Sequence, residues 1–306
     1  MSGENGPPAW MQHQERGSLF WLRVMVWLSL RLGRRLTRPV VYFIALYFLL
    51  TARTARRASR TYLGRALGRP ARGFELYRHV LCFAGSIHDR LYLLNGRTRA
   101  LRLRHAGTAA LHAAHAQGGV LLFGAHFGSF EALRALGREN LPGQVSLLMY
   151  PDNARQINAT LAAINPQAMA DIIPLGQLDT MLEVSHRLEQ GGLISVLADR
   201  ASGQDRHLTL PFLGAPAQFP TGPFRMAAML RRPVFFMAGI HEGGNRYAVH
   251  FEPLADFSQV TRATREAAIE AALHAYVATL ERHCRANPWN WFNFFDFWES
   301  SPDASA

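Results

Sequence analysis

The chain has 306 residues, of which 49% are hydrophobic, and it carries a formal net charge of +11. This composition argues against a disordered or low-complexity protein and supplies enough apolar residues for a sizeable core. Its two cysteines, Cys82 and Cys284, lie far apart and belong to no metal-binding spacing. A disulfide scaffold and a structural zinc site are therefore disfavoured, and a reducing compartment is the default.

The positive charge is concentrated in the N-terminal part of the chain. The first 80 residues hold 14 arginines and 3 acidic residues, whereas the rest of the chain holds 19 of each. Nucleic acid and anionic lipid both attract a basic segment. Because the arginines here alternate with long aliphatic and aromatic runs and form no groove, an anionic membrane surface is the favoured partner and nucleic acid is disfavoured.

Residues 18–38 have the pattern of an amphipathic helix. Apolar residues recur at helical spacing, and four arginines gather on the helical wheel: Leu19, Leu22, Val26 and Leu30, with Arg31, Arg34, Arg35 and Arg38. The stretch 39–50 that follows has no charged residue. As a helix it would span about 18 Å, short of the roughly 30 Å of a hydrocarbon core.

Four interpretations of this segment stay open. A cleaved signal peptide is disfavoured, because arginines occur throughout and no small-residue cleavage pattern follows. A single transmembrane helix would need Arg34, Arg35 or Arg38 to snorkel, and two core-packing helices of a soluble protein are a further alternative. A monotopic helical hairpin lying in the interface fits best. We therefore predict a membrane-associating segment over residues 1–72 and a second domain over 73–306.

From residue 74 onward, strand and helix patterns alternate. Helices are expected at 74–94, 108–117, 130–136, 153–164, 178–189, 221–231 and 264–284. Strands are expected at 120–124, 145–150, 172–173, 193–198, 207–212, 234–240 and 247–251. This alternation predicts an α/β fold in which a mixed central sheet is flanked by helices.

The segment Gly124–Leu136, GAHFGSFEALRAL, carries the strongest chemical signal. His126 and Glu131 are five residues apart, a spacing at which two side chains on one continuous helix diverge by about 140°. They meet only if His126 lies in the turn before the helix, which Gly128 permits, with Ser129 as N-cap. Glu131 in the first helical turn would then hold one ring nitrogen and leave the other free as a general base.

This pattern has an ordinary structural explanation as well. An acidic residue in the first turn of a helix is favourable for the helix dipole alone, and a histidine after a strand is often a capping or core residue. The spacing by itself leaves both explanations open. In the catalytic one, no protein nucleophile is built in, so the nucleophile would be a hydroxyl or amine of the substrate.

The same segment resembles the lysophospholipid acyltransferase superfamily, whose signature is His, four residues, then Asp or Glu. The chain is more closely similar to its branch of lauroyl and myristoyl transferases of lipid A biosynthesis. The further blocks that carry this resemblance, over roughly residues 10 to 298, are Trp10 with Glu15–Gly17, Tyr150–Arg155, Asp199-Arg200, Leu210–Gly214 with Phe219–Pro223, and Pro288–Trp298.

The resemblance implies an acyltransferase with His126 as general base and Glu131 as its orienting partner. The donor would be an acyl thioester of acyl carrier protein or coenzyme A, and the acceptor a lipid or glycolipid at the cytoplasmic face of a bacterial inner membrane. Backbone N–H groups at the turn and helix start near Gly128–Phe130, or the side chain of Arg155 or Arg200, would stabilise the oxyanion. No cofactor and no metal is required.

Two further expectations concern single residues and the C-terminal end. Arg155, Asp199 and Arg200 are candidates to hold a phosphate or phosphopantetheine group, with an ordinary surface ion pair as the alternative. Seven aromatic residues between 289 and 298 either pack back on the core or contact membrane or acyl chain. Two other functions stay open for the whole protein: a catalytically silent membrane-bound adaptor, and a thioesterase-like hydrolase in which water replaces the acceptor.

Overall fold

The computed structural model of the chain describes residues 19–140, 145–151, 160–162, 164–165, 172–176, 179–200 and 206–298. Its helices are α1 (Leu19–Leu32), α2 (Arg34–Thr51), α3 (Arg53–Leu67), α4 (Gly73–Leu94), α5 (Thr108–His115), α6 (Phe130–Asn140), α8 (Thr180–Glu189), α9 (Gly222–Leu230) and α10 (Arg265–Ala286). Its strands are β1 (Arg102–Ala106), β2 (Val120–Gly124), β3 (Val145–Met149), β4 (Ile172–Pro174), β5 (Leu193–Leu197), β6 (His207–Phe212), β7 (Ala215–Pro220), β8 (Pro233–Gly243) and β9 (Arg246–Asp256).

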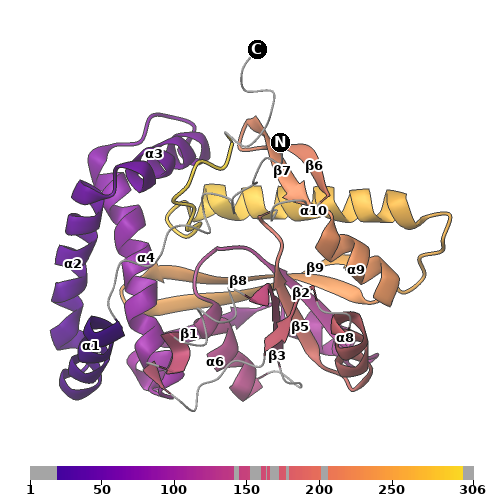
Figure 1. The fold of residues 1–306 in the computed structure, drawn as a ribbon, viewed down its shortest axis with the longest axis horizontal. Helices are drawn as coiled ribbons and strands as arrows, with labels where there is room; N and C mark the ends of the chain where they lie inside the picture. Colours follow the sequence, from indigo (N-terminus) through magenta and orange to yellow (C-terminus); the bar gives the residue numbers. More distant parts are fainter. Residues whose placement is uncertain are drawn as a thin grey trace, which may run out of the picture.

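Seven strands form the central sheet, in the order β1-β9-β8-β2-β5-β3-β4. The pairs from β8 through β2, β5 and β3 to β4 are parallel, and only β8 and β9 pair antiparallel, so the sheet is mixed. The predicted α/β class and the mixed sheet flanked by helices are confirmed. β6 and β7 form a separate hairpin, and α10 lies along one face of the sheet while α6 lies on the other (Figure 1).

Strand β2 lies in the middle of the sheet and is buried along its whole length. Its side chains alternate between two cores, as a strand covered on both faces requires. Leu121 and Phe123 join the core formed with α8, α9 and α10, whereas Val120 and Leu122 join the core formed with α5 and α6. This double burial explains the short apolar runs by which β2 and β5 are recognised in the sequence.

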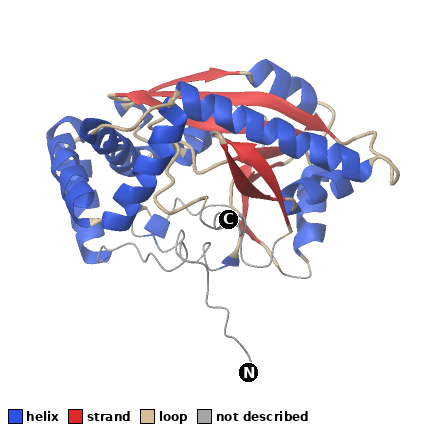
Figure 2. Cartoon of the chain, turned by 90° about the horizontal axis from the view of Figure 1, so that it is seen from above, coloured by secondary structure: helices blue, strands red, loops and turns tan. Residues whose placement is uncertain are grey.

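Helices α1 to α4 stand together at one end of the sheet (Figures 1 and 2). Helix α4 begins at a capping box, in which the Glu75 carboxylate accepts the backbone N–H of Arg72 at 2.7 Å. Helix α3 reaches the main core through Tyr62 and Leu63, which are fully buried. The expected domain boundary after residue 72 falls between α3 and α4.

Arg34 and Arg38 of α2 point into the protein. Arg34 makes a bidentate contact with the buried carboxylate of Asp89 in α4, at 2.7 and 2.9 Å, and Arg38 lies 3.7 Å from the same group. Tyr247 of β9 donates its hydroxyl to Asp89 at 2.8 Å, so the cluster joins α2, α4 and the sheet. The two arginines thus do not snorkel as a spanning helix would require.

Within the residues that the structure describes, no single helix is both long and apolar enough to cross a membrane. Helices α2 and α3 together have the length and composition, but they are bent by 96° at their junction.

Most expected elements are present, with ends that differ by a few residues. The sequence patterns did not indicate strand β1, helix α3 or strand β7. β1 is an edge strand with four exposed residues and β7 holds two prolines, so neither shows an apolar alternation. The helix expected at 153–164 lies largely outside the described residues.

The aromatic C-terminal stretch packs back on the core, one of the two alternatives expected for it. Trp291, Phe297 and Trp298 are buried around Phe212 of β6, which Trp298 stacks on and the other two rings meet edge-on. This brings residues 290–292 beside the turn that follows β2, where Phe127 and Trp291 form an antiparallel bridge.

Candidate active site

The candidate site forms where two neighbouring parallel strands end at the same level. Gly124, the last residue of β2, is in register with Leu197, the last residue of β5. His126 and Asp199 are each the second residue beyond these ends, so the parallel pairing places them side by side. Open α/β sheets commonly bind ligands at the carboxyl ends of their strands.

Asp199 holds His126 at two points. The Nδ1 atom of the imidazole lies 2.9 Å from Oδ1 of Asp199, and the backbone N–H of His126 donates to Oδ2 at 3.1 Å. An ionised carboxylate only accepts, so Nδ1 carries the proton of the neutral ring and Nε2 keeps its lone pair. The Asp199 side chain is 0% exposed whereas that of His126 is 35% exposed, so a substrate can reach the base but not the carboxylate.

Burial and neighbouring charges together favour an ionised Asp199 carboxylate and a neutral His126 imidazole. Burial of Asp199 opposes ionisation, but His126 and the nearby Arg200 more than offset it and lower the pKa of Asp199. Desolvation and the positive charge of Arg200 lower the pKa of His126, against the opposing effect of Asp199. The imidazole is therefore neutral, and able to act as a base, at neutral pH.

The turn that carries His126 is fixed by close backbone contacts. Gly128 has a φ of +73°, and a Cβ there would collide with the carbonyl oxygen of Gly239 in β8. The N–H of Gly128 donates to the carbonyl of Asn290 at 2.8 Å, and that of Ser129 to Gly239 at 2.7 Å. Ser129 Oγ accepts the N–H of Ala132 at 3.2 Å, which confirms the expected N-cap of α6.

Glu131 does lie in the first turn of α6, but the structure does not bring it to the imidazole. Its carboxylate forms an ion pair with Arg90 of α4, at 2.8 Å between Oε1 and Nε. The expected contact between Glu131 and His126 is therefore corrected, because Asp199 holds Nδ1. The side chain of Glu131 is instead held at α4 by Arg90.

The residues expected to bind substrate lie in different surroundings. Arg155 lies outside the described residues. Asp199 faces His126 and is sealed from solvent, and Arg200 donates to the carbonyl of Phe292 at 3.0 Å and lies over the ring of Phe295. The two side chains form an ion pair with each other at 3.9 Å, but it is buried and not an ordinary surface pair. The N–H of Gly128, expected as an oxyanion donor, is already used by Asn290.

A family model for bacterial lipid A biosynthesis acyltransferases matches residues 10–300 of the chain. The chain belongs to this family. It is therefore an acyltransferase, as the resemblance of its motifs implies. A comparison with curated proteins finds no match.

The sequence patterns did not predict that C-terminal residues contact the candidate site of this acyltransferase. Trp291 is fully buried and donates its indole N–H to Oδ2 of Asp199 at 3.1 Å. Asn290 pairs with the backbone of His241 through both atoms of its amide, at 2.7 and 3.2 Å. The aromatic composition indicated burial, but no sequence signal joined this segment to Asp199.

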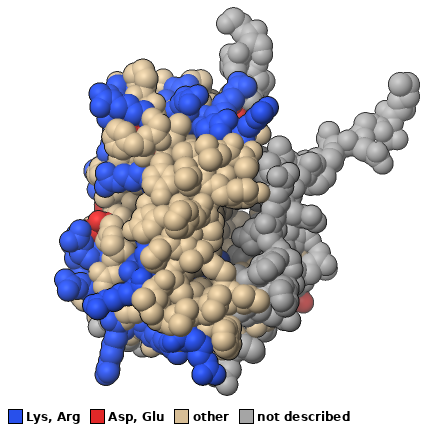
Figure 3. Space-filling model, turned by 90° about the vertical axis from the view of Figure 1, so that its left-hand side faces the viewer, with Lys and Arg blue, Asp and Glu red and all other residues tan. Residues whose placement is uncertain are grey.

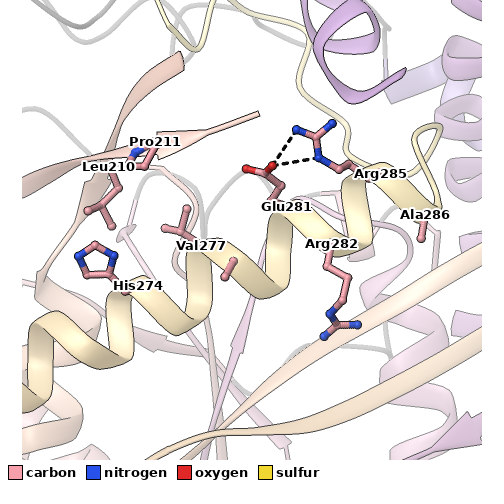
Figure 4. Close-up of a pocket in the computed structure, with 9 residues that line it drawn as sticks. Leu210, Pro211, His274, Val277, Glu281, Arg282, Arg285 and Ala286 are labelled. Carbon is pink, nitrogen blue, oxygen red and sulfur yellow. Dashed lines mark hydrogen bonds and ion pairs between the residues drawn. The ribbon is translucent and has the colours of Figure 1, made fainter. Parts of the chain in front are cut away.

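A separate hollow lies on the outer side of α10, beside the β6–β7 hairpin (Figure 4). Leu210, Pro211 and Val277 supply apolar lining, and the charged groups at its edge have partners. Glu281 pairs with Arg285 at 2.8 Å, and Arg282 pairs with Glu252 of β9. Since none of these groups belongs to the His126–Asp199 pair, we place no reaction in this hollow.

Proposed function

We propose that this acyltransferase moves a fatty acyl chain from an acyl thioester to a hydroxyl, or an amine, of a lipid or glycolipid acceptor, with His126 as general base. The observation that carries the proposal is the His126–Asp199 pair, in which Asp199 holds Nδ1 at 2.9 Å, the side chain of His126 is 35% exposed, and no described residue is hydrogen-bonded to Nε2. Of the described residues, no serine, threonine or cysteine is hydrogen-bonded to the imidazole. The nucleophile then comes from the acceptor.

The reaction follows from this arrangement. Nε2 of His126 takes the proton of the acceptor hydroxyl while its oxygen attacks the thioester carbonyl. The tetrahedral intermediate collapses, the carbon–sulfur bond breaks, and the imidazolium returns the proton to the thiolate that leaves. Asp199 stabilises the imidazolium and fixes the tautomer, replacing Glu131 in that role. General-base catalysis of this kind contributes about 10²- to 10⁴-fold.

We propose that Arg200 stabilises the negative charge that develops on the carbonyl oxygen of the thioester. Its guanidinium is held by the carbonyl of Phe292 and by the ring of Phe295, and its charge acts on the imidazole. A fixed positive charge near the reacting carbonyl costs no reorganisation during the reaction. Gly128 and Ser129 do not supply this charge stabilisation, because their N–H groups donate within the protein.

We propose that the donor is an acyl thioester of acyl carrier protein or coenzyme A, and that transfer takes place at the cytoplasmic face of the inner membrane. Support for a membrane comes from α2, whose outward face is apolar and forms a continuous uncharged band with arginines along its borders (Figure 3). The most exposed of its large hydrophobic side chains are Leu36, Phe43, Tyr47 and Leu50. Soluble proteins rarely expose so large an apolar patch.

The anchoring of α2 favours peripheral binding over insertion. Arg34 and Arg38 are held by Asp89, so α2 stays along the protein while its other face is available to lipid. Arg35, Arg53 and Arg60 are exposed and can meet anionic headgroups. This supports a monotopic attachment through α2.

The test is acyl transfer by a His126→Ala variant, followed by mass spectrometry of lipids from a deletion strain that carries either form. We expect the variant to lose transfer with both acyl carrier protein and coenzyme A thioesters, whereas His186→Ala, an exposed histidine on α8, retains it. Unchanged lipids with His126→Ala would overturn the proposal and favour the adaptor. Thioester cleavage at the full rate without any lipid acceptor would instead favour the hydrolase.

A further inference from the structure

The carboxylate of Asp199 receives three N–H donors. Two come from His126, and the third is the indole Nε1–H of Trp291, which reaches Oδ2 at 3.1 Å. Because His126 is the group to be oriented, the indole is the donor that fixes Asp199 independently of it. Asp199 and Trp291 are both 0% exposed, so no water competes for this bond.

Trp291 is itself held from the N-terminal helices. Its carbonyl oxygen lies 2.8 Å from Nε2 of His79 in α4, and Nδ1 of His79 lies 2.8 Å from Oγ of Ser59 in α3. A carbonyl only accepts, so Nε2 of His79 carries the proton and Nδ1 accepts from the serine hydroxyl. Burial lowers the pKa of His79 to about 4, which keeps this ring neutral.

These bonds form one continuous path from α3 to the base: Ser59, His79, Trp291, Asp199 and His126. The first four residues are fully buried, and they come from α3, α4, the C-terminal stretch and the end of β5. Buried polar groups that are fully hydrogen-bonded specify one arrangement, because breaking any of their bonds leaves an unsatisfied group without water.

We propose that Trp291 is a positioning residue for acyl transfer, fixing the Asp199 carboxylate against His126, and that Ser59 and His79 hold Trp291 in place. The inference rests on the proposed role of His126 as general base. It makes the docking of α3 and α4 on the catalytic part a condition for a correctly oriented base.

A purely structural role for Trp291 is the competing explanation. Its ring packs edge-on against Tyr62 and Phe297, so removing it entirely would cost stability for reasons unrelated to Asp199. Trp291→Phe keeps an aromatic ring and removes the N–H donor. Trp298→Phe is the matched control, because Trp298 is buried in the same cluster and its Nε1 has no hydrogen-bond partner among the described residues.

The experiment measures kcat, KM and the pH dependence of kcat/KM for both variants, together with their melting temperatures. We expect Trp291→Phe to lower kcat by about tenfold or more at nearly unchanged KM, because a charge-assisted hydrogen bond is lost. The midpoint of the pH profile should move upward, because the less stabilised carboxylate favours the imidazolium more strongly. Trp298→Phe should leave kcat and the midpoint unchanged.

A second pair of variants tests the path without touching the indole. His79→Leu removes the donor to the Trp291 carbonyl, and His79→Gln offers an amide N–H in its place. We expect kcat to fall in the first and to be partly restored in the second. The proposal is overturned if Trp291→Phe has the wild-type kcat and midpoint, or if the losses only follow the melting temperature. If Trp291→Phe behaves as the wild type while His126→Ala abolishes transfer, the positioning role of Trp291 is rejected but His126 remains the general base. If His126→Ala is fully active, the proposed function itself is rejected.

Discussion

Asp199 contacts His126 through both of its carboxylate oxygens, one at the ring Nδ1 and the other at the backbone N–H. The same carboxylate therefore sets the tautomer of the imidazole and the position of the turn that carries it. Both residues follow the ends of adjacent parallel strands, β2 and β5, so the sheet itself defines their separation. In the proposed role of His126 as general base, this arrangement orients the imidazole before substrate binds.

Arg200 should set the pH range in which the enzyme works. Desolvation of His126, together with the charge of Arg200, lowers the pKa of the imidazole, and the base acts only when deprotonated, so kcat/KM should fall as pH drops through a midpoint below the ordinary histidine value. Arg200→Gln removes the charge and should move this midpoint to higher pH. Arg200→Lys keeps the charge and should shift it less. A midpoint that is unchanged in Arg200→Gln would show that Arg200 does not act on the base.

Gly128 should be intolerant of any side chain. Its φ of +73° strains other residues by about 1–3 kcal/mol, and a Cβ would also collide with the Gly239 carbonyl. We expect Gly128→Ala to lower the melting temperature and to reduce activity by displacing His126. Gly96→Ala is the control for backbone strain alone, since Gly96 has a φ of +66° and open space around it. Equal losses in the two variants would mean that the contact with Gly239 is unimportant.

The apolar face of α2 should govern binding to lipid. Phe43 is 73% exposed there, so Phe43→Asp replaces a large apolar side chain with a charge without disturbing the core. We expect its affinity for vesicles of anionic phospholipid to fall at least about tenfold, measured by sedimentation with the vesicles. Leu182→Asp, at an equally exposed leucine on α8, should bind as the wild type does. Equal weakening by both variants would contradict docking through α2.

The sequence predicted the sheet and the turn of the site from local patterns. Apolar runs indicated β2 and β5, and Gly128 with Ser129 indicated a turn before α6, all of which the structure contains. The predicted contact between His126 and Glu131 was wrong. Spacing along the chain favoured Glu131, but the residue that lies beside His126 depends on which strands pair. β2 and β5 pair with parallel register, and only that long-range fact brings Asp199 to the imidazole.

The contribution of the C-terminal stretch was outside the reach of local patterns for a related reason. Its aromatic content predicted that it would be shielded from water, either by the core or by lipid, and the structure shows the first of these. The hydrogen bond from Trp291 to Asp199 joins residues 92 positions apart, and it depends on how the chain returns after α10. Among the expected site residues, His126 lies in the turn before α6, as the motif predicts, and the N–H of Gly128 donates to Asn290 within the protein.

The most direct measurement compares kcat for acyl transfer in Asp199→Asn and Glu131→Gln, with folding of both variants checked by melting temperature. Asparagine brings an amide group to the same position and no longer fixes the ring tautomer, so we expect Asp199→Asn to lose about 10³- to 10⁴-fold in kcat. Glu131→Gln removes only the charge that pairs with the partly exposed Arg90, keeps the shape of the side chain, and should lose less than about tenfold. The reverse order, with Asp199→Asn close to wild type and Glu131→Gln inactive, would contradict Asp199 as the residue that orients His126.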